Sequence, residues 1–212
     1  MSKSILIEGL QASGKTCSLR NLDPKKTFFV NCDGKFDPWK DFSKNYNAKN
    51  KNYLKTKDFD KILNLLDVIG KEQTQIKYVV IDTISAAMVA REMLDTKSNN
   101  GFQKWSDIGS FGYGIMEKAN ELRDDLVIIM VGHTAVNDEG FETLVTNGRK
   151  LEKINLTGYA SLVLLTRHED GQYKFILRSE NSSARVPMGY FEDKDEIEND
   201  IVLVLKELGW EY

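Results

Sequence analysis

Short apolar runs alternate along the chain with longer segments in which apolar residues recur every three or four positions. The run over residues 4–8 is a short strand candidate, and 27–32 is a second strand. The runs over 78–82 and 126–132 are rich in β-branched residues and have the length of strands that are buried on both faces. Such strands separated by helical segments are typical of right-handed βαβ units. The pattern therefore predicts the α/β fold class, with helices on both faces of a mainly parallel central sheet.

One helical segment shows apolar residues at the spacing i, i+3, i+4 and i+7, namely Ile62, Leu65, Leu66 and Ile69. Asp58 is placed to cap this helix and Gly70 to end it. Further helices are expected to begin near Lys15 and Ile84. An amphipathic helix over 195–208 is expected to close the fold.

Towards the C-terminus, the stretches 160–167 and 172–179 flank Glu169-Asp170-Gly171, which is typical of a tight β-hairpin. We expect this antiparallel hairpin to lie at the C-terminal edge of the sheet. The length of 212 residues is that of one domain, so residues 1–212 are predicted to form a single domain.

Composition narrows the classes of protein that the pattern allows. With 29 Lys and Arg residues against 32 Asp and Glu residues, the net charge of -3 excludes coating of nucleic acid by bulk charge, although a local basic site is still allowed. The start of the chain has no signal-peptide pattern, no apolar run is long enough to span a membrane, and Cys17 and Cys32 are too few for a disulfide framework. We therefore expect a cytoplasmic protein without membrane partners. A Lys- and Asn-rich insertion over 44–57 and an acidic helix over 192–212 are expected within the domain.

Residues 9–16, Gly-Leu-Gln-Ala-Ser-Gly-Lys-Thr, match the pattern G-x-x-x-x-G-K-[S/T] between a predicted strand and a predicted helix. Glycines at these positions let backbone N–H groups surround phosphate oxygens, and the following helix N-terminus adds its dipole. Lys15 is expected to reach the β- and γ-phosphates of ATP. A helix-capping turn with an incidental lysine is the alternative. The residues assigned to nucleotide binding are Gly9, Gln11, Ala12, Ser13, Gly14, Lys15, Thr16 and Cys17.

A phosphate-binding loop of this kind needs a second acid at the end of a neighbouring strand, and the apolar run 78–82 ends in Asp82. We expect the Thr16 hydroxyl and the Asp82 carboxylate to hold Mg²⁺ and its water shell. The alternative is that Asp82 caps the helix that begins near Ile84. One residue is able to serve both roles.

The strand over 27–32 continues into Asp33 and then into Asp37-Pro38. This arrangement resembles RecA-type recombinases, in which a strand runs into a carboxylate followed shortly by an Asp-Pro or Arg-Pro turn. The resemblance implies that Asp33, in a position usually held by glutamate, aligns and deprotonates the attacking water. A solvated turn aspartate is the alternative interpretation.

A second match follows the run 126–132, which ends in His133. RecA-like proteins carry at this place a polar residue that contacts the γ-phosphate and leads into a DNA-binding loop, so the resemblance implies this role for His133. A capping or core histidine is the alternative. A third match joins residues 146–151 to 158–164, a stretch similar to the end of the second DNA loop of RecA. Together with the compact size, these features look most like phage Sak-type ATPases, which are RecA-core single-strand-annealing proteins.

The resemblance implies binding of ATP and Mg²⁺, binding of single-stranded DNA, and assembly into a ring or filament for homologous recombination in a host cytoplasm. A single-strand-binding protein is a further expected partner. Two loops, 96–110 and 135–153, combine basic residues with aromatic or Gly-rich sequence, which suits sequence-tolerant binding of single strands. Solvated loops are the alternative, and for the insertion 44–57 a solvated face is favoured. The residues assigned to DNA contact are Phe102, Lys104, Trp105, Arg149 and Lys150.

RecA-like ATPases complete their site with a cation from the neighbouring subunit. Lys174, Arg178 and Arg185 are the candidates, with a surface charge as the alternative. The predicted activity is ATP hydrolysis that DNA stimulates. Two other activities stay open: an ATP-gated loader with slow hydrolysis, and a small nucleotide kinase, which the scattered arginines disfavour. The residues assigned to catalysis are Lys15, Asp33, Asp82, His133 and Arg178.

Overall fold

The computed structural model describes residues 3–98, 113–145, 156–192 and 194–211. Its elements in chain order are β1 (Lys3–Gly9), η1 (Thr16–Leu19), β2 (Thr27–Asn31), α1 (Phe42–Asn45), β3 (Tyr53–Lys55), α2 (Phe59–Glu72), β4 (Tyr78–Asp82), α3 (Ile84–Ser98), β5 (Val127–Val136), β6 (Glu142–Leu144), η3 (Leu156–Tyr159), β7 (Leu162–Glu169), β8 (Gln172–Ile176), β9 (Glu196–Glu198) and α5 (Ile201–Glu207). Residues 113–121 form a further helix before β5. Within these described ranges, no helix has the length and hydropathy needed to cross a membrane.

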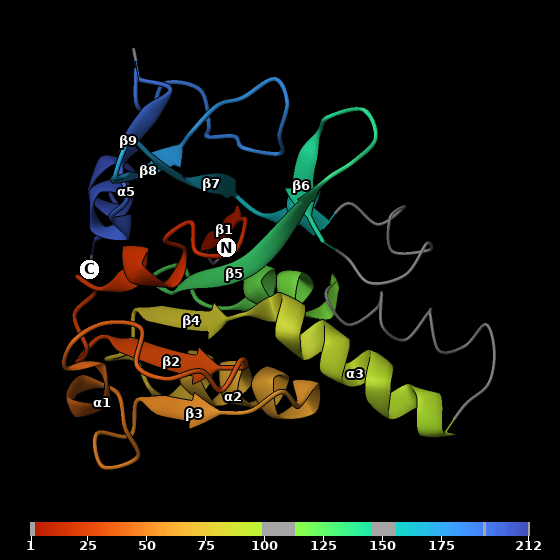
Figure 1. Cartoon of the computed structure of the whole chain (residues 1–212). Helices are drawn as coiled ribbons and strands as arrows, with labels where there is room; N and C mark the ends of the chain where they lie inside the picture. The colour runs from red at the N-terminus through yellow and green to blue at the C-terminus, as the bar shows by residue number, and fades with distance from the viewer. Residues whose placement is uncertain (1–2, 99–112, 146–155, 193, 212) are drawn as a thin grey trace.

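The strands form one sheet in the order β3-β2-β4-β5-β1-β7-β8-β9, and β6 pairs with the end of β5 (Figure 1). The pairs from β3 through β7 are parallel, whereas β7, β8 and β9 are joined by antiparallel pairing. The predicted α/β class, with a mainly parallel sheet and an antiparallel hairpin at the C-terminal edge, is confirmed.

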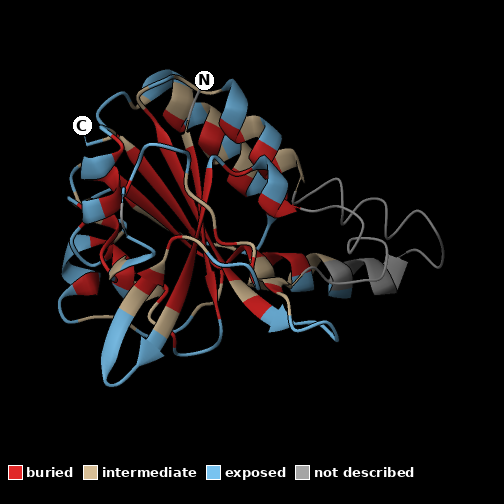
Figure 2. Cartoon of the chain, turned by 90° about the horizontal axis from the view of Figure 1, so that it is seen from above, coloured by how far each residue is buried: buried red, intermediate tan, exposed pale blue. Residues whose placement is uncertain are grey.

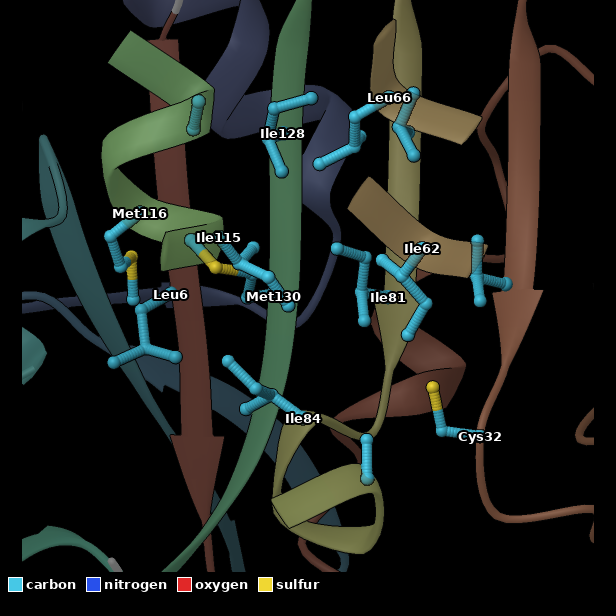
Figure 3. Close-up of a cluster of buried hydrophobic side chains, with 14 of the residues drawn as sticks. Leu6, Cys32, Ile62, Leu66, Ile81, Ile84, Ile115, Met116, Ile128 and Met130 are labelled. Carbon is cyan, nitrogen blue, oxygen red and sulfur yellow. The ribbon is translucent and has the colours of Figure 1, made fainter. Parts of the chain in front are cut away.

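The strands of the sheet are largely buried between the covering helices (Figure 2). Two clusters of apolar side chains fill its two faces. On one face, Leu6, Ile81 and Ile128 pack with residues of α2, α3 and the helix over 113–121 (Figure 3). On the other face, side chains such as Ile129 pack with residues of η1, α1 and α5. This burial on both sides explains why β1, β4 and β5 are continuous apolar runs in the sequence.

Helix α2 has the predicted start but not the predicted end. The Asp58 side chain accepts a hydrogen bond from the backbone N–H of Lys61. The predicted end at Gly70 is wrong, because the helix continues to Glu72. A Cβ atom at Gly70 would lie 2.6 Å from Cδ2 of Leu122, so close packing accounts for this glycine. The buried residues of α2 are Phe59, Ile62, Leu66 and Ile69.

The helix predicted from Lys15 is wrong in its extent, because only the 3-10 turn η1 forms there. Leu19 and Leu22 are buried just after the phosphate-binding motif, and the chain then reaches Asp23-Pro24. A residue before proline is disfavoured in helical backbone, so a longer helix has no room before β2 begins.

The helix predicted over 195–208 is split into two elements. Residues Glu196–Glu198 are strand β9, paired with β8, and α5 begins only at Ile201. The Asp200 side chain caps α5 by accepting a hydrogen bond from the Val202 N–H at 3.0 Å. Because Ile197 points into the core between two glutamates, this acidic stretch has the period of a strand. The acidic helix predicted over 192–212 is therefore wrong in its first half.

Two other regions also differ from their expected form. Strand β5 extends beyond the run 126–132 because β6 pairs with it from Thr134 onwards. The segment 44–57 contributes to the packed structure, since it contains β3 and buries Tyr46. The Tyr46 ring lies 5.4 Å from the ring of Phe29, between centroids, on one face of the sheet.

The side chain of Leu66 is fully buried, whereas that of Leu203 in α5 is 40% exposed. We expect Leu66→Ala to lower the free energy of unfolding by about 2–5 kcal/mol, because it removes buried methyl groups and leaves a cavity. The matched substitution Leu203→Ala is expected to cost less than about 1 kcal/mol. Urea unfolding of the two variants measures the difference, and equal costs would contradict the placement of α2 against the sheet.

Candidate functional site

The carboxyl ends of four adjacent strands, β2, β4, β5 and β1, meet at one edge of the sheet. The register pairs Gly9 of β1 with His133 of β5, and Asp82 ends β4 on the other side of β5. Asp33 follows β2 by two residues. The sheet therefore brings these candidate residues, which are far apart in the sequence, to one edge.

The loop between β1 and η1 has the backbone conformation that its glycines predict. Positive φ angles occur at Gly9 (155°), Ala12 (62°) and Gly14 (95°). A Cβ atom at Gly9 would lie 2.2 Å from Oγ1 of Thr166, and one at Gly14 would lie 2.7 Å from Cδ1 of Tyr173. Both glycines are thus required by conformation and by close neighbours.

The Lys15 side chain is buried across this loop. Its Nζ atom donates hydrogen bonds to the carbonyl oxygens of Gly9 at 2.8 Å and Leu10 at 2.5 Å. Burial lowers the pKa of Lys15 to about 8, although the carboxylates of Asp82 and Asp33 act in the opposite direction. The ammonium group is therefore held at the phosphate-binding loop by backbone oxygens that an anionic phosphate is able to replace.

Thr16 and Asp82 are in direct contact, because Oγ1 of Thr16 donates to Oδ2 of Asp82 at 3.0 Å. The other carboxylate oxygen, Oδ1, is buried without a hydrogen-bond partner. Burial raises the pKa of Asp82 to about 6, and the neighbouring Asp33 carboxylate adds to this effect. A buried carboxylate oxygen beside a hydroxyl group is a suitable donor set for a hard cation such as Mg²⁺.

The protein itself supplies only part of a coordination sphere. Among the described residues there is no group of three or more His, Cys, Asp or Glu side chains that could hold a metal ion. Mg²⁺ usually keeps several water ligands and is shared between one or two protein groups and substrate phosphates. Thr16 and Asp82 therefore fit a metal that arrives with a nucleotide.

Both oxygens of the Asp33 carboxylate are occupied. Oδ1 accepts a hydrogen bond from Oγ1 of Thr83 at 2.8 Å, and Oδ2 lies 2.5 Å from Nζ of Lys35. Burial raises the pKa of Asp33, but the hydrogen bonds from Lys35 and Thr83 outweigh this effect and hold the pKa below its usual value. Lys35 was not among the site residues predicted from the sequence, although a cation two residues after a candidate base is a recognisable signal.

His133 is half-buried beside the loop, and its backbone N–H donates to Oγ of Ser85 at 3.0 Å. Burial and the charges of Lys15 and Lys35 lower the pKa of His133, so the imidazole is neutral at pH 7. The expectation that the strand ends at this histidine is wrong, because β5 continues to Val136. A neutral imidazole at this position has a nitrogen that is able to donate to a phosphate oxygen.

Residues 1–186 match a protein family described as AAA domain. The chain belongs to this family. Its fold matches that of a KaiC-like protein from the hyperthermophilic archaeon Pyrococcus horikoshii OT3, with a TM-score of 0.51 and 16% sequence identity, over 82% of this chain and 76% of that chain. At this identity the likeness shows the fold alone, a RecA-like α/β core. No curated protein matches the sequence.

The remaining residues of the phosphate-binding loop of this AAA domain are either exposed to solvent or attach the loop to neighbouring segments. Oγ of Ser13 lies 2.5 Å from Oγ1 of Thr166, which joins the loop to β7. The Sγ atom of Cys17 donates to the Pro38 carbonyl at 3.4 Å. The residues of the loop that are exposed to solvent include Gln11, Ala12 and Cys17.

The three candidate cations for a neighbouring site each contact groups of their own chain. Lys174 forms an ion pair with Glu196 at 2.5 Å. Arg178 lies two residues beyond β8, so it does not share that strand with Lys174, and it donates to three backbone carbonyl groups within 190–194. Arg185 donates to two carbonyl groups in and next to η3. In this structure the two arginines therefore hold chain segments together.

The residues assigned to DNA contact lie outside the described residues: Phe102, Lys104, Trp105, Arg149 and Lys150. Of the second candidate DNA loop, 135–153, the structure describes residues 135–145, which form the base of the loop. Here β5 and β6 form an antiparallel hairpin at the edge of the molecule (Figure 1). This hairpin begins next to His133, so it joins the candidate site to the start of the second loop.

A buried group of charges behind the loop was missed from the sequence. Glu8 directly precedes Gly9, accepts a hydrogen bond from Ser183 on Oε1, and leaves Oε2 buried without a partner. Glu142 of β6 forms an ion pair with Arg167 of β7. Burial raises the pKa of Glu8 to about 7. The visible signal was a single glutamate inside the apolar strand that leads to the loop.

The raised pKa of Glu8 predicts a specific pH dependence of stability. Between pH 4.5 and about 7, the folded protein binds the Glu8 proton more tightly than the unfolded chain does, so this residue makes the protein less stable as the pH rises through that range. At pH 8 the Glu8 carboxyl is mostly ionised in the folded protein, and its raised pKa then costs on the order of 3 kcal/mol of stability. We expect Glu8→Gln to stabilise the protein at pH 8 and to have little effect at pH 4.5.

Urea unfolding at several pH values tests this expectation. Gln keeps the oxygen that accepts from Ser183, so the substitution mainly removes the titrating group. Glu139→Gln, at an exposed position, is the matched control and should leave the pH dependence unchanged. Parallel pH profiles for the wild type and Glu8→Gln would show that the buried carboxyl does not govern stability.

Proposed function

We propose that this AAA domain binds ATP with Mg²⁺ and hydrolyses it at the carboxyl edge of the sheet. The contact of the Thr16 hydroxyl with Asp82, whose second oxygen is buried and unpartnered, carries this proposal. The buried ammonium group of Lys15 lies at the same loop. A cation-binding pair next to a phosphate-binding loop is the arrangement that a nucleoside triphosphate and its metal require.

The residues around this loop have distinct roles in the proposed reaction. Lys15 exchanges the carbonyl groups of Gly9 and Leu10 for phosphate oxygens, and bound Mg²⁺ supplies charge neutralisation. Asp33 orients a water molecule and takes its proton, while the water oxygen bonds to the γ-phosphorus and the bond to the bridging oxygen breaks. ADP leaves with the electron pair of that bond, phosphate forms, and Asp33 returns the proton to solvent. His133 donates a hydrogen bond that depends on the presence of the γ-phosphate.

We further propose that the protein binds single-stranded DNA and takes part in phage-type recombination, by strand annealing or strand exchange. The resemblance to Sak-type ATPases and the basic and aromatic composition of the loops 96–110 and 135–153 support this role. Several copies assembled into a ring or filament in a host cytoplasm would align these loops along one strand. A cation from the neighbouring copy would then complete the site.

The structure bears differently on the two alternative activities, a loader with slow hydrolysis and a nucleotide kinase. A loader with slow hydrolysis is favoured by Asp33, because both of its oxygens are already occupied by Thr83 and Lys35. A nucleotide kinase is disfavoured, because five arginines of the described residues already bind backbone carbonyl groups or carboxylates of this chain. These arginines are Arg20, Arg123, Arg167, Arg178 and Arg185.

We expect Lys15→Ala to reduce ATP turnover at least about 100-fold, because it removes a charge that stabilises the transferring phosphoryl group. Asp33→Ala should reduce turnover while retaining ATP binding. Lys71→Ala is the control, since this lysine is also paired with a carboxylate but lies at the far end of α2. Phosphate release gives the rates, and unchanged turnover in Lys15→Ala would refute the proposed site.

The DNA role predicts that single-stranded DNA increases ATP turnover by the wild type. Its affinity should fall linearly on a log–log plot against salt concentration, because lysine and arginine displace counterions from phosphates. The double variant R149A/K150A is expected to bind less tightly and to show a shallower slope in a gel-shift titration. Turnover that DNA does not change would favour the loader, and phosphoryl transfer to a nucleoside monophosphate would favour the kinase.

A further inference from the structure

The turn after β2 brings a second lysine to the candidate site. The backbone N–H of Gly34 donates to Oδ1 of Asn31 at 2.7 Å, and Gly34 has a φ of 71°. This tight turn reverses the chain directly after Asp33, so that the Lys35 side chain returns to the carboxylate of its neighbour. The Nζ atom of Lys35 lies 2.5 Å from Oδ2 of Asp33.

The charge of Lys35 acts on side chains from four separate parts of the chain. It lowers the pKa values of four groups that face the same edge of the sheet, which are Lys15, Asp33, Asp82 and His133. Through its ion pair with Asp33, the ammonium group is held near enough to the candidate site for its charge to act on all four groups. A group that acts on all four is well placed to meet an anion bound between them.

Lys35 also has the freedom to move. Its side chain is 68% exposed, whereas that of its partner Asp33 is only 11% exposed. Its charge is held by one carboxylate through a flexible four-carbon chain. By contrast, Arg178 and Arg185 are bound to several backbone carbonyl groups. Among these cations, Lys35 needs the smallest rearrangement to change its partner.

We propose that Lys35 is a catalytic cation of this site in cis, which leaves Asp33 for the γ-phosphate when a nucleoside triphosphate binds. This inference rests on the proposed ATPase function. In this structure Thr83 contacts one oxygen of Asp33 and Lys35 the other, so neither oxygen is without a protein partner, and the Lys35 charge lies where an attacking water would be oriented. Transfer of Lys35 to the γ-phosphate frees Oδ2.

One movement thereby has two consequences for the reaction. The freed carboxylate oxygen of Asp33 accepts a hydrogen bond from the attacking water and takes its proton as the water oxygen bonds to phosphorus; the proton then passes to solvent. The bond from phosphorus to the β,γ-bridging oxygen breaks, and the ammonium group of Lys35 neutralises charge on the transferring phosphoryl oxygens. ADP carries no γ-phosphate, so it leaves the pair of Lys35 and Asp33 intact.

The test compares Lys35→Ala with Lys61→Ala, whose lysine is equally exposed and also pairs with an aspartate. For Lys35→Ala we expect kcat to fall at least about 100-fold. We also expect the preference for ATP over ADP, measured by equilibrium binding, to fall at least about tenfold, with ADP affinity nearly unchanged. Lys35→Arg should retain part of the turnover, whereas Lys35→Met should not.

The controls distinguish a failure of the Lys35 inference from a failure of the proposed ATPase function. If the wild type neither binds nor hydrolyses ATP, the proposed function itself fails. If the wild type is active and Lys35→Ala matches or exceeds its kcat with the same ATP preference, the role of Lys35 is refuted. A mixture of Lys15→Ala and Lys35→Ala should stay inactive, because restored turnover would mean that the lysine acts on a neighbouring subunit. Thermal midpoints within about 2 °C of the wild type exclude misfolding.

Discussion

The site depends on the burial of two opposite charges at the carboxyl edge of the sheet. These charges are the Lys15 ammonium and the Asp82 carboxylate. A charge removed from water is costly unless polar groups surround it. Lys15 finds two backbone carbonyls, but Asp82 finds only the Thr16 hydroxyl and keeps one oxygen unpartnered. Their pKa values, about 8 and about 6, are both displaced towards the neutral form. A phosphate and a cation would supply the missing partners, so the proposed nucleotide binding would relieve a cost that the fold creates.

The same edge is joined by polar contacts to the hairpin of β5 and β6. Ser13 of the loop contacts Thr166 of β7, and the next residue, Arg167, pairs with Glu142 of β6. Glu142 also accepts a hydrogen bond from Thr134, the neighbour of His133. These contacts form a continuous path from the phosphate-binding loop to the base of the second loop. These contacts would carry any shift of the loop that the proposed nucleotide binding causes to that hairpin.

The predictable parts of the site rest on local sequence. The motif at 9–16 and the apolar run ending in Asp82 were recognisable because a strand buried on both faces has one clear pattern and the loop has a fixed spacing. Elements whose form depends on partners were not predictable. Residues Glu196–Glu198 became strand β9 because β8 offers a free edge, although their neighbours on the chain have a helical pattern.

The sequence by itself determined the α/β class, the order of the central strands along the chain, and the residue types of the phosphate-binding loop, since these depend on periodicity and on short motifs. Only the tertiary structure decided which charges meet. The strand order places His133 beside Gly9, buries Glu8 behind the loop, and returns Lys35 to Asp33. The physical reason is that burial and pairing energies depend on distances in space, and neighbours from distant strands set those distances.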